Sequence, residues 1–344
     1  MAVPVSVWIL AARTDLPYLA KTIPHQMKVC DYPFVEKVLA LDTAPLSGDK
    51  LTRYGTGSQS EVREACQKLV DAGVMDRIEE IDYDPALVET IYTKYFGAEQ
   101  ARHMRGHTHN WKGSTVYASL YCIEQAASDC YLHFDADMLL YQAPDFNWIT
   151  EAVQLLKDIP EIAAMRPLCG PPHPDGKLFQ KHVYRHDSRG FYAHDVFSMR
   201  AYLVDRRQFA RLSPIPLSWK YQPMWSRWLP KPLQSLSAKV ERRLRKNTTS
   251  VEGAIASFEP MTSQRLQETD FFRADLSSPK AWTIHPANHS AQFIEALPQL
   301  IQFIEQGLYP QEQAGHYDLK LDAWLTEAFL QGSAPNGSNY ANKC

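Results

Sequence analysis

The chain has 344 residues, and its 45% apolar and 22% charged residues are ordinary values for a globular protein with a sizeable core. A net charge of −3 argues against a general nucleic-acid binder, and the lack of any run of about 18 apolar residues argues against a membrane-spanning helix. The six cysteines form no CxxC pair and no zinc spacing, so we expect reduced thiols in a cytoplasmic protein.

Strand-like and helix-like segments alternate along roughly the first 135 residues. We expect strands over residues 5–11, 35–41, 78–81 and 131–134, and helices over residues 16–27, 61–72, 85–95 and 115–127. Short apolar strands that alternate with amphipathic helices are typical of a sheet covered by helices on both faces. The sequence therefore predicts a Rossmann-like α/β fold with a mainly parallel sheet, in a single large domain.

The second half of the chain is less regular. Its expected elements are a helix over 148–159, strands over 162–165, 196–204 and 281–284, and a helix over 291–306. The expected domain covers residues 1–310, in two halves of 1–145 and 146–310. A C-terminal helix over 311–331 and a disordered tail over 332–344 follow it.

A basic segment interrupts the second half. Residues 206–246 contain eleven Lys or Arg and one acid, Glu241, for a net charge of about +10, and the expected insertion extends to residue 250. Three tryptophans lie within it, at positions 219, 225 and 228. Three interpretations stay open: a lid or acceptor loop over the active site, a peripheral contact with anionic membrane, or a solvated surface.

Two aspartates end the strand predicted over 131–134. In "CYLHFDADMLLY", Asp135 and Asp137 are two residues apart, where ligands bind in open α/β sheets. Two neighbouring carboxylates repel each other unless a cation lies between them, and Mn²⁺ or Mg²⁺ with oxygen ligands suits this position. Because such an ion also takes phosphate oxygens as ligands, the pattern predicts a metal-bound nucleotide diphosphate. The alternative is a structural turn.

The chain contains a second D-x-D, formed by Asp82, Tyr83 and Asp84. Pro85 follows it directly, and proline is favoured in the first turn of a helix. We therefore interpret Asp84 as a helix N-cap and give this copy no catalytic role.

The order of three motifs resembles that of GT-A glycosyltransferases, most closely the inverting family-two type. These motifs are "VSVWILAARTD" at the start, "VEKVLALDTAP" one unit later and "CYLHFDADM" near residue 130. The resemblance implies a GT-A fold and a nucleotide-sugar donor, UDP- or GDP-linked, with a hydroxyl-bearing acceptor. It also implies that Ala11, Arg13 and Asp42 hold the nucleotide. The family's longer acidic turn is reduced here to Asp42 alone.

The resemblance implies two further functional positions. A C-terminal histidine as third metal ligand corresponds to His285 in "KAWTIHPANH", with His289 as a weaker candidate. The base that deprotonates the acceptor corresponds to Glu252 in "TTSVEGAIASF", where Gly253 replaces the family's following aspartate. Asp270 and Asp195 are the alternatives for this base.

A cation near the diphosphate is expected from "RGHTHNWKGST". Lys112 precedes the helix that leads to the paired aspartates, so it is a candidate for contact with the diphosphate. A solvent-facing lysine is an equal alternative, and Arg105 and His107 occupy the same region without a ranking.

The leading hypothesis is an inverting, metal-dependent glycosyltransferase. A nucleotide-sugar-binding module without turnover is the non-enzymatic alternative. A sugar-phosphate nucleotidyltransferase would need a glycine-rich loop after the first strand, and "LAARTDLPY" has no glycine.

Overall fold

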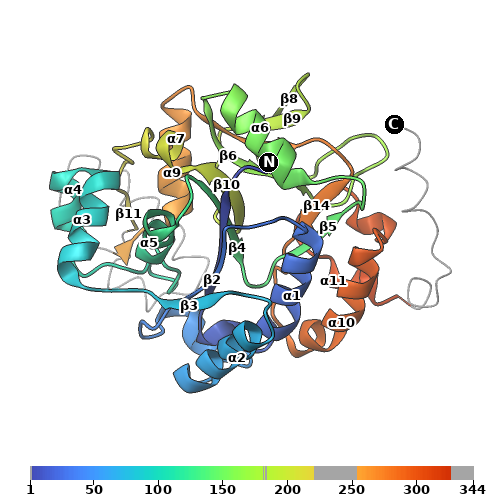
Figure 1. Ribbon diagram of the computed structural model, residues 1–344, viewed down its shortest axis with the longest axis horizontal. Helices are drawn as coiled ribbons and strands as arrows, with labels where there is room; N and C mark the ends of the chain where they lie inside the picture. The colour runs from blue at the N-terminus through green and yellow to red at the C-terminus, as the bar shows by residue number, and fades with distance from the viewer. Residues whose placement is uncertain (1, 181, 183, 221–253, 327–344) are drawn as a thin grey trace, which may run out of the picture.

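The computed structural model describes residues 2–180, 182, 184–220 and 254–326. Within these residues, a nine-stranded sheet forms the centre of the protein, with helices on both faces (Figure 1). The strand order is β3-β2-β1-β4-β10-β6-β13-β9-β8. The strands are β1 (Val5–Ala11), β2 (Glu36–Leu41), β3 (Arg77–Glu80), β4 (Cys130–Asp135), β6 (Ile162–Arg166), β8 (Tyr184–Asp187), β9 (Phe191–His194), β10 (Ala201–Asp205) and β13 (Phe272–Leu276).

The sheet is mainly parallel. Among its nine described strands, β9 and β10 run against the other seven, as the pairings between neighbours require. Strands from both halves of the chain join this one sheet. The predicted α/β class, with a mainly parallel sheet flanked by helices, is therefore confirmed.

Two smaller sheets adjoin it in the described residues. One contains β5 (Leu139–Gln142), β14 (Ala281–Ile284) and β7 (Leu168–Cys169), and the other pairs β11 (Trp219–Lys220) with β12 (Ala254–Ile255).

The two faces of the sheet bury two separate apolar cores. Successive side chains of a strand point to opposite faces, so Val7 and Ile9 of β1 belong to one core and Trp8 to the other. The first core includes α1 (Leu19–Cys30), α2 (Gln59–Asp71), α6 (Trp148–Asp158) and α10 (Ala291–Glu305). The second includes α3 (Pro85–Phe96), α4 (Ala98–His103), α5 (Tyr117–Gln125), α7 (Arg206–Ala210) and α9 (Phe258–Gln267). Figure 1 shows these groups of helices on either side of the strands.

Local sequence signals explain where several helices begin. The Ser58 side chain accepts a hydrogen bond from the Glu61 amide, and Glu61 bonds back to the Ser58 amide, which forms a capping box for α2. Asp84 accepts hydrogen bonds from the amides of Ala86 and Leu87 at the start of α3, in agreement with the predicted N-cap.

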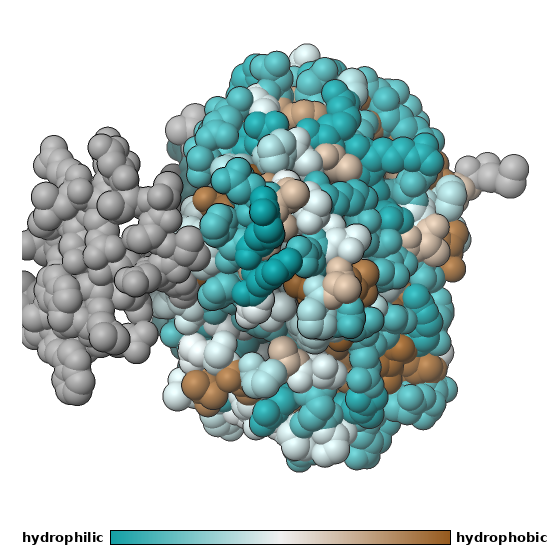
Figure 2. Space-filling view, turned by 90° about the vertical axis from the view of Figure 1, so that its left-hand side faces the viewer, coloured by the Kyte–Doolittle hydropathy of each residue, from teal (hydrophilic) through white to brown (hydrophobic). Residues whose placement is uncertain are grey.

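Hydrophilic residues predominate on the face that carries α3 and α4, with hydrophobic residues scattered among them (Figure 2).

Some sequence-based element predictions are wrong. The strand predicted over 196–204 begins only at Ala201, and α1 begins at Leu19 because a 3-10 turn over Arg13–Asp15 precedes it. The central strand β13 was missed, since its sequence "FRADL" carries two charged residues that pair with each other inside the sheet. Helix α9 and the β8–β9 hairpin were missed as well.

The helix predicted over 311–331 is also wrong in its described part, which ends at residue 326. A 3-10 turn over Gln311–Gln313 and the short α11 (Leu321–Trp324) are separated by residues 314–320. The backbone between them pairs with other segments instead of with itself: the Gly315 amide donates to Pro171 and the His285 amide donates to Tyr317. No helix among the described residues is long and apolar enough to cross a membrane.

Candidate functional site

The carboxyl edge of the sheet has a topological switch point beside β1. Strands β2 and β3 lie on one side of β1 and β4 lies on the other, so the connections leave in opposite directions. Ligands of open α/β sheets bind in the crevice that such a reversal opens. The loops after β1, β2 and β4 meet at this edge and carry most of the predicted site residues.

Asp135 is the last residue of β4. Its amide donates to the Arg200 carbonyl at 2.7 Å, which ties the end of β4 to the start of β10. The His133 Nε2 lies 3.2 Å from Asp135 Oδ1, and the Asp135 side chain is 38% exposed. Asp135 is therefore the member of the pair that solvent, and hence a ligand, reaches.

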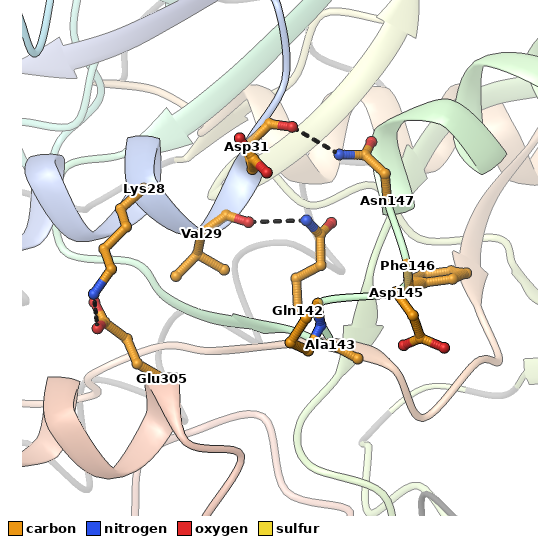
Figure 3. A pocket seen from close by; sticks show the side chains of 10 residues that line it. Lys28, Val29, Asp31, Gln142, Ala143, Asp145, Phe146, Asn147 and Glu305 are labelled. Carbon is orange, nitrogen blue, oxygen red and sulfur yellow. Dashed lines mark hydrogen bonds and ion pairs between the residues drawn. The ribbon is translucent and has the colours of Figure 1, made fainter.

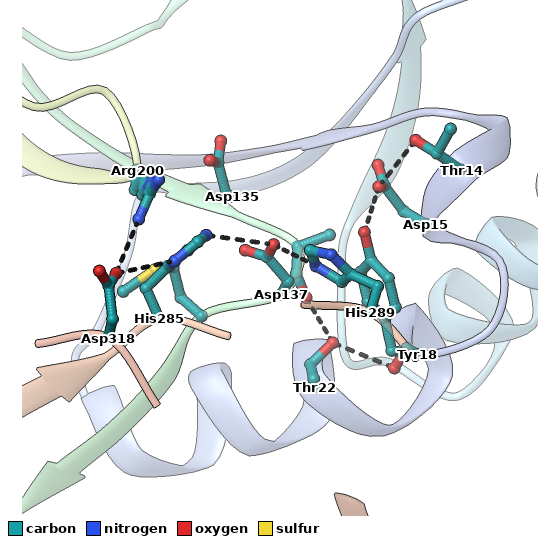
Figure 4. A network of polar contacts seen from close by, with 12 residues as sticks. Thr14, Asp15, Tyr18, Thr22, Asp135, Asp137, Arg200, His285, His289 and Asp318 are labelled. Atoms are coloured by element: carbon teal, nitrogen blue, oxygen red, sulfur yellow. Dashed lines mark hydrogen bonds and ion pairs between the residues drawn. The ribbon is translucent and has the colours of Figure 1, made fainter. Parts of the chain in front are cut away.

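Asp137 is buried, with only 8% of its side chain exposed. Its Oδ2 lies 2.7 Å from Nε2 of His289 and 3.7 Å from Nε2 of His285, while its Oδ1 is buried without a hydrogen-bond partner (Figure 4). Burial alone would raise the pKa of Asp137, but the two imidazoles lower it to about 2. Asp137 is thus an anion with one oxygen still available for a ligand.

Both histidines reach Asp137 from the segment that follows β14. The backbone of His285 pairs with the C-terminal segment through the Tyr317 carbonyl and the Leu319 amide, and its Nδ1 lies 3.5 Å from Asp318. The ring of His289 packs 5.1 Å from the ring of Tyr18. The structure therefore brings His285 and His289, the two predicted histidines, to the same carboxylate.

These residues fit a divalent metal ion in their chemistry. Two carboxylates and two imidazoles supply oxygen and nitrogen donors, which suit Mn²⁺ or Mg²⁺ together with phosphate oxygens. The buried Asp137 Oδ1 is a donor that no protein group uses. In the part of the chain that the structure describes, no three His, Cys, Asp or Glu side chains already converge as a metal-binding group. Asp135 instead faces His133, and Asp137 faces His285 and His289, so these side chains would have to rotate to bind one metal ion.

A further carboxylate, the half-buried Asp15, lies near Asp137 and was missed in the sequence. It accepts a hydrogen bond from the Ala12 amide at 2.8 Å and one from the Tyr18 hydroxyl at 2.5 Å. Burial raises the pKa of Asp15, the charge of Asp137 raises it further, and Lys50 acts in the opposite direction. Burial would raise the pKa of Asp42, but His109 and Tyr83 lower it, and Lys50, in the loop after β2, adds to this effect.

The predicted nucleotide residues lie after β1 and β2. Ala11 ends β1 and is buried, and the Arg13 Nε donates to the Gly57 carbonyl at 2.8 Å. Asp42 is 5% exposed, and both of its oxygens accept hydrogen bonds, from Tyr83 at 2.7 Å and from His109 at 2.9 Å. The roles of these residues toward a nucleotide stay predictions.

Lys112 is exposed on a loop that interlocks with the loop after β2. Its carbonyl accepts a hydrogen bond from the Asp49 amide at 3.1 Å, and its Nζ lies 5.1 Å from the centroid of the Trp111 ring. This loop contact brings Lys112 next to the segment that carries Lys50. A contact with a diphosphate stays a prediction for Lys112, while Arg105 pairs with Glu89 on α3.

The candidate bases are dispersed. Glu252 lies outside the described residues. Asp195 and Asp270 line a cavity of about 330 Å³ beside the end of β9 and the start of β13. Because β13 runs in the same direction as β4, the start of β13 is at the opposite edge of the sheet from Asp135. Asp195 and Asp270 therefore do not lie at the candidate site, and both alternatives for the base are wrong.

Glu259, in the first turn of α9, is a further carboxylate near Asp135. Burial raises its pKa; the charge of Asp135 adds to this effect, and Arg200, Arg166 and Arg273 oppose it. Its carboxyl group makes no hydrogen bond or ion pair with any described residue. The sequence "SFEPM" contains a helix start, which is the one signal that could have directed attention to Glu259.

A cavity of about 510 Å³ lies elsewhere, between α1, β5 and α6 (Figure 3). Its polar groups are paired with one another: Lys28 contacts Glu305, and Asn147 donates to the carbonyls of Cys30 and Asp31. Asp145 pairs with Lys280, and among the described residues that line the cavity only the exposed carboxylate of Asp31 has no partner, so the cavity offers no cluster of charged groups to a ligand.

No protein-family model matches the sequence. The search of curated proteins gives no match either. Among solved structures, GalNAc-T7 with UDP, GalNAc and Mn²⁺ is similar with a TM-score of 0.46 and 11% identity, over 83% of this chain and 44% of that chain. The galactosyltransferase LgtC with donor and acceptor sugar analogues has a TM-score of 0.35 and 12% identity, over 89% of this chain and 98% of that one. The glycosyltransferase GlyE of Streptococcus pneumoniae TIGR4 has a TM-score of 0.33 and 10% identity, over 98% of this chain and 62% of that one. These values are too low to support a shared mechanism or substrate.

Proposed function

We propose that the chain is a metal-dependent glycosyltransferase that moves a sugar from a nucleotide diphosphate to a hydroxyl group. The observation that carries the proposal is the pair Asp135 and Asp137 at the switch point, with His285 and His289 against the buried member. An anionic pair at this edge, with a buried carboxylate oxygen that lacks a partner, suits a divalent cation and the diphosphate that it binds. Mn²⁺ or Mg²⁺, when bound there, would neutralise charge on the leaving diphosphate.

The donor would lie along the edge from β4 toward β2. The resemblance suggests a UDP or GDP group there, and Ala11, Arg13 and Asp42, at and after the ends of β1 and β2, would hold the nucleotide. Lys50 and Lys112, on the interlocked loops, would place positive charge near the diphosphate.

Acceptor activation requires a carboxylate on the other side of β4. The acceptor oxygen forms the new bond to the anomeric carbon, the bond from that carbon to the diphosphate breaks, and the acceptor proton passes to the carboxylate. Among the described residues, Glu259 suits this role because its carboxyl group is unpaired and its raised pKa makes it a stronger base. A base opposite the leaving group implies inversion, and Glu252 stays an alternative outside the described residues.

The basic segment stays unassigned in function. Its residues 221–250 lie outside the described residues, so the lid or acceptor loop, the contact with anionic membrane and the solvated surface stay predictions. Within the described part, Arg206 donates to the carbonyls of Ala126 and Glu124 and supports the turn after α5.

The test is a screen of UDP- and GDP-linked sugars with Mn²⁺ and mixed hydroxyl acceptors, with release of free nucleoside diphosphate as the signal. The proposal expects release that requires both metal and acceptor and that Asp137→Asn abolishes. Tight nucleotide binding without any turnover would instead support a binding module, and the lack of both would refute the proposal.

A further inference from the structure

A buried arginine ends strand β6 and forms no hydrogen bond or ion pair through its side chain with the described residues. Arg166 is 2% exposed, and its Nε and Nη2 are buried with no hydrogen-bond partner. Among the residues that the structure describes, no carboxylate lies within 4.0 Å of its guanidinium group. A guanidinium is charged at any pH that proteins experience, and a buried charge without hydrogen bonds is strongly unfavourable. Asp275 and Glu259 balance this charge only from beyond ion-pair distance, so among the described residues two guanidinium nitrogens keep a hydrogen-bonding capacity that the fold does not use.

The neighbouring buried carboxylate is already used by other groups. Asp275 accepts hydrogen bonds from Nε and Nη2 of Arg273 at 2.8 and 3.0 Å, and from the thiol of Cys169 at 3.0 Å. Both of its oxygens are thus engaged, so Asp275 is not the missing partner of Arg166. Glu259 lies near but forms no ion pair with it.

A second arginine shares the same aromatic ring with Arg166. The guanidinium carbons of Arg166 and Arg200 lie 4.8 and 5.9 Å from the centroid of Tyr317. The Arg200 side chain is 36% exposed, and its contact with Asp318 is long, at 3.5 Å. The two cations therefore form a cluster with one buried member and one member that a ligand can reach.

The cluster lies on the acceptor side of the candidate site. The Arg200 carbonyl accepts a hydrogen bond from the Asp135 amide, so the cluster adjoins the paired aspartates. Arg166 belongs to β6, which lies beyond β10 on the side of β4 away from β1 and β2. The proposed nucleotide residues Arg13 and Asp42 lie on the opposite side, which separates this cluster from the nucleotide.

We propose that Arg166 and Arg200 bind a carboxylate or phosphate group of the acceptor, so that the substrate to be glycosylated is anionic. The planar fork of a guanidinium donates two parallel hydrogen bonds to such a group, and this would satisfy the buried nitrogens of Arg166. The assignment to an acceptor rests on the proposed function, whereas the anion site itself does not.

Calorimetric titration of the full-length protein tests this site with inorganic phosphate and with glucuronate, in the presence of saturating UDP and Mg²⁺. Methyl glucoside, which has no charge, is the control ligand. We expect at least one anion to bind, and its Kd to rise at least tenfold in Arg166→Met and in Arg200→Gln. Arg189→Met is the matched control, because Arg189 is exposed and pairs with Asp187 in the β8–β9 turn; its Kd should not change. Phosphate alone would identify a phosphorylated acceptor, and glucuronate would identify an acidic sugar.

The stability of Arg166→Met separates a ligand-binding role from a structural one. An apolar side chain of similar length should leave the urea midpoint unchanged or raise it, because the variant removes a buried charge that has no partner. A lower midpoint would show that Arg166 stabilises the fold and would overturn the proposal. Failure of both anions to bind would also overturn the proposal, and so would anion binding that UDP displaces. Failure of both UDP and GDP to bind would contradict the proposed function, while anion binding without nucleotide would still support the site.

Discussion

The substitution Gly113→Ala tests how the loop after β2 is held at the edge of the sheet. Gly113 has a φ of +80°, and a Cβ atom on it would lie 2.1 Å from the Ser47 carbonyl oxygen. Such an approach is too close for any side chain, so the two loops would have to separate. The segments that carry Lys50 and Lys112 would move with them.

The magnitude follows from two separate costs. An L-residue in the left-handed region costs about 1–2 kcal/mol, and overpacking against a rigid backbone adds about 1–3 kcal/mol. Gly106 offers a matched control, because its φ is +78° and a Cβ on it would have no atom within 4 Å. We therefore expect Gly113→Ala to lower the free energy of unfolding by about 2–5 kcal/mol and Gly106→Ala by only about 1–2 kcal/mol.

Urea denaturation of both variants measures this difference, and calorimetry with UDP and Mn²⁺ measures its effect on the site. Gly113→Ala should bind UDP more weakly than Gly106→Ala, because only the former displaces the lysines. Equal losses of stability and equal UDP affinity in the two variants would refute the interlocked arrangement of the loops.

Three further predictions concern other parts of the protein. The hydrogen bonds of His25 and then Lys28 lower the pKa of Glu305 to about 2, so the stability they confer is present above the unfolded pKa of about 4 and is lost as the pH falls toward 2. Urea denaturation should show Glu305→Gln to be less stable than the parent protein by about 1 kcal/mol at pH 6, a value that allows for solvent screening. The difference should be smaller near pH 3. A difference that does not change with pH would contradict this prediction. Asp84→Ala removes the N-cap of α3 and should lower the free energy of unfolding by about 1 kcal/mol in the same assay, without any change in nucleotide affinity. Glu259→Gln should lower kcat by about 10²-fold or more while UDP affinity is kept, and a parallel loss of both would make Glu259 a donor-binding or structural residue.

The first half of the fold could be predicted because its signals are local. Strands such as "VSVWILA" are apolar on both faces, and Ser58 and Asp84 mark helix starts through their own side chains. The position of Asp135 at the end of such a strand then places it at the carboxyl edge.

The second half of the fold depends on contacts between distant segments. Strand β13 contains Arg273 and Asp275, and it is stable only because these charges pair with each other within the sheet.

In the candidate site, too, some residues could be predicted from local sequence signals and others depend on contacts between distant segments. The paired aspartates and His285 follow strands, so their meeting point follows from the topology. Glu259 and Arg166 lie in no motif, and Asp15 ends the motif "VSVWILAARTD" without any sign of a role; each is distinguished only by its surroundings in the fold. In the sequence, Arg166 looks like the polar residue at the end of an apolar strand. In the structure, two of its nitrogens are buried and have no hydrogen-bond partner. The lack of a hydrogen bond is a property of three-dimensional packing that no spacing of residues reveals.

The most direct test of a metal–nucleotide site at Asp135 and Asp137 is calorimetric titration of UDP and GDP with and without Mn²⁺. Asp137→Asn and Asp135→Asn each remove one charge with little change of shape, and Asp82→Asn makes the same change in the second D-x-D, whose Asp82 only caps the Asp84 amide. We expect Mn²⁺ to strengthen nucleotide binding to the parent protein and to Asp82→Asn by tenfold or more, and we expect this gain to disappear in Asp137→Asn and Asp135→Asn. Nucleotide binding that is indifferent to Mn²⁺ and equal in all four proteins would contradict it.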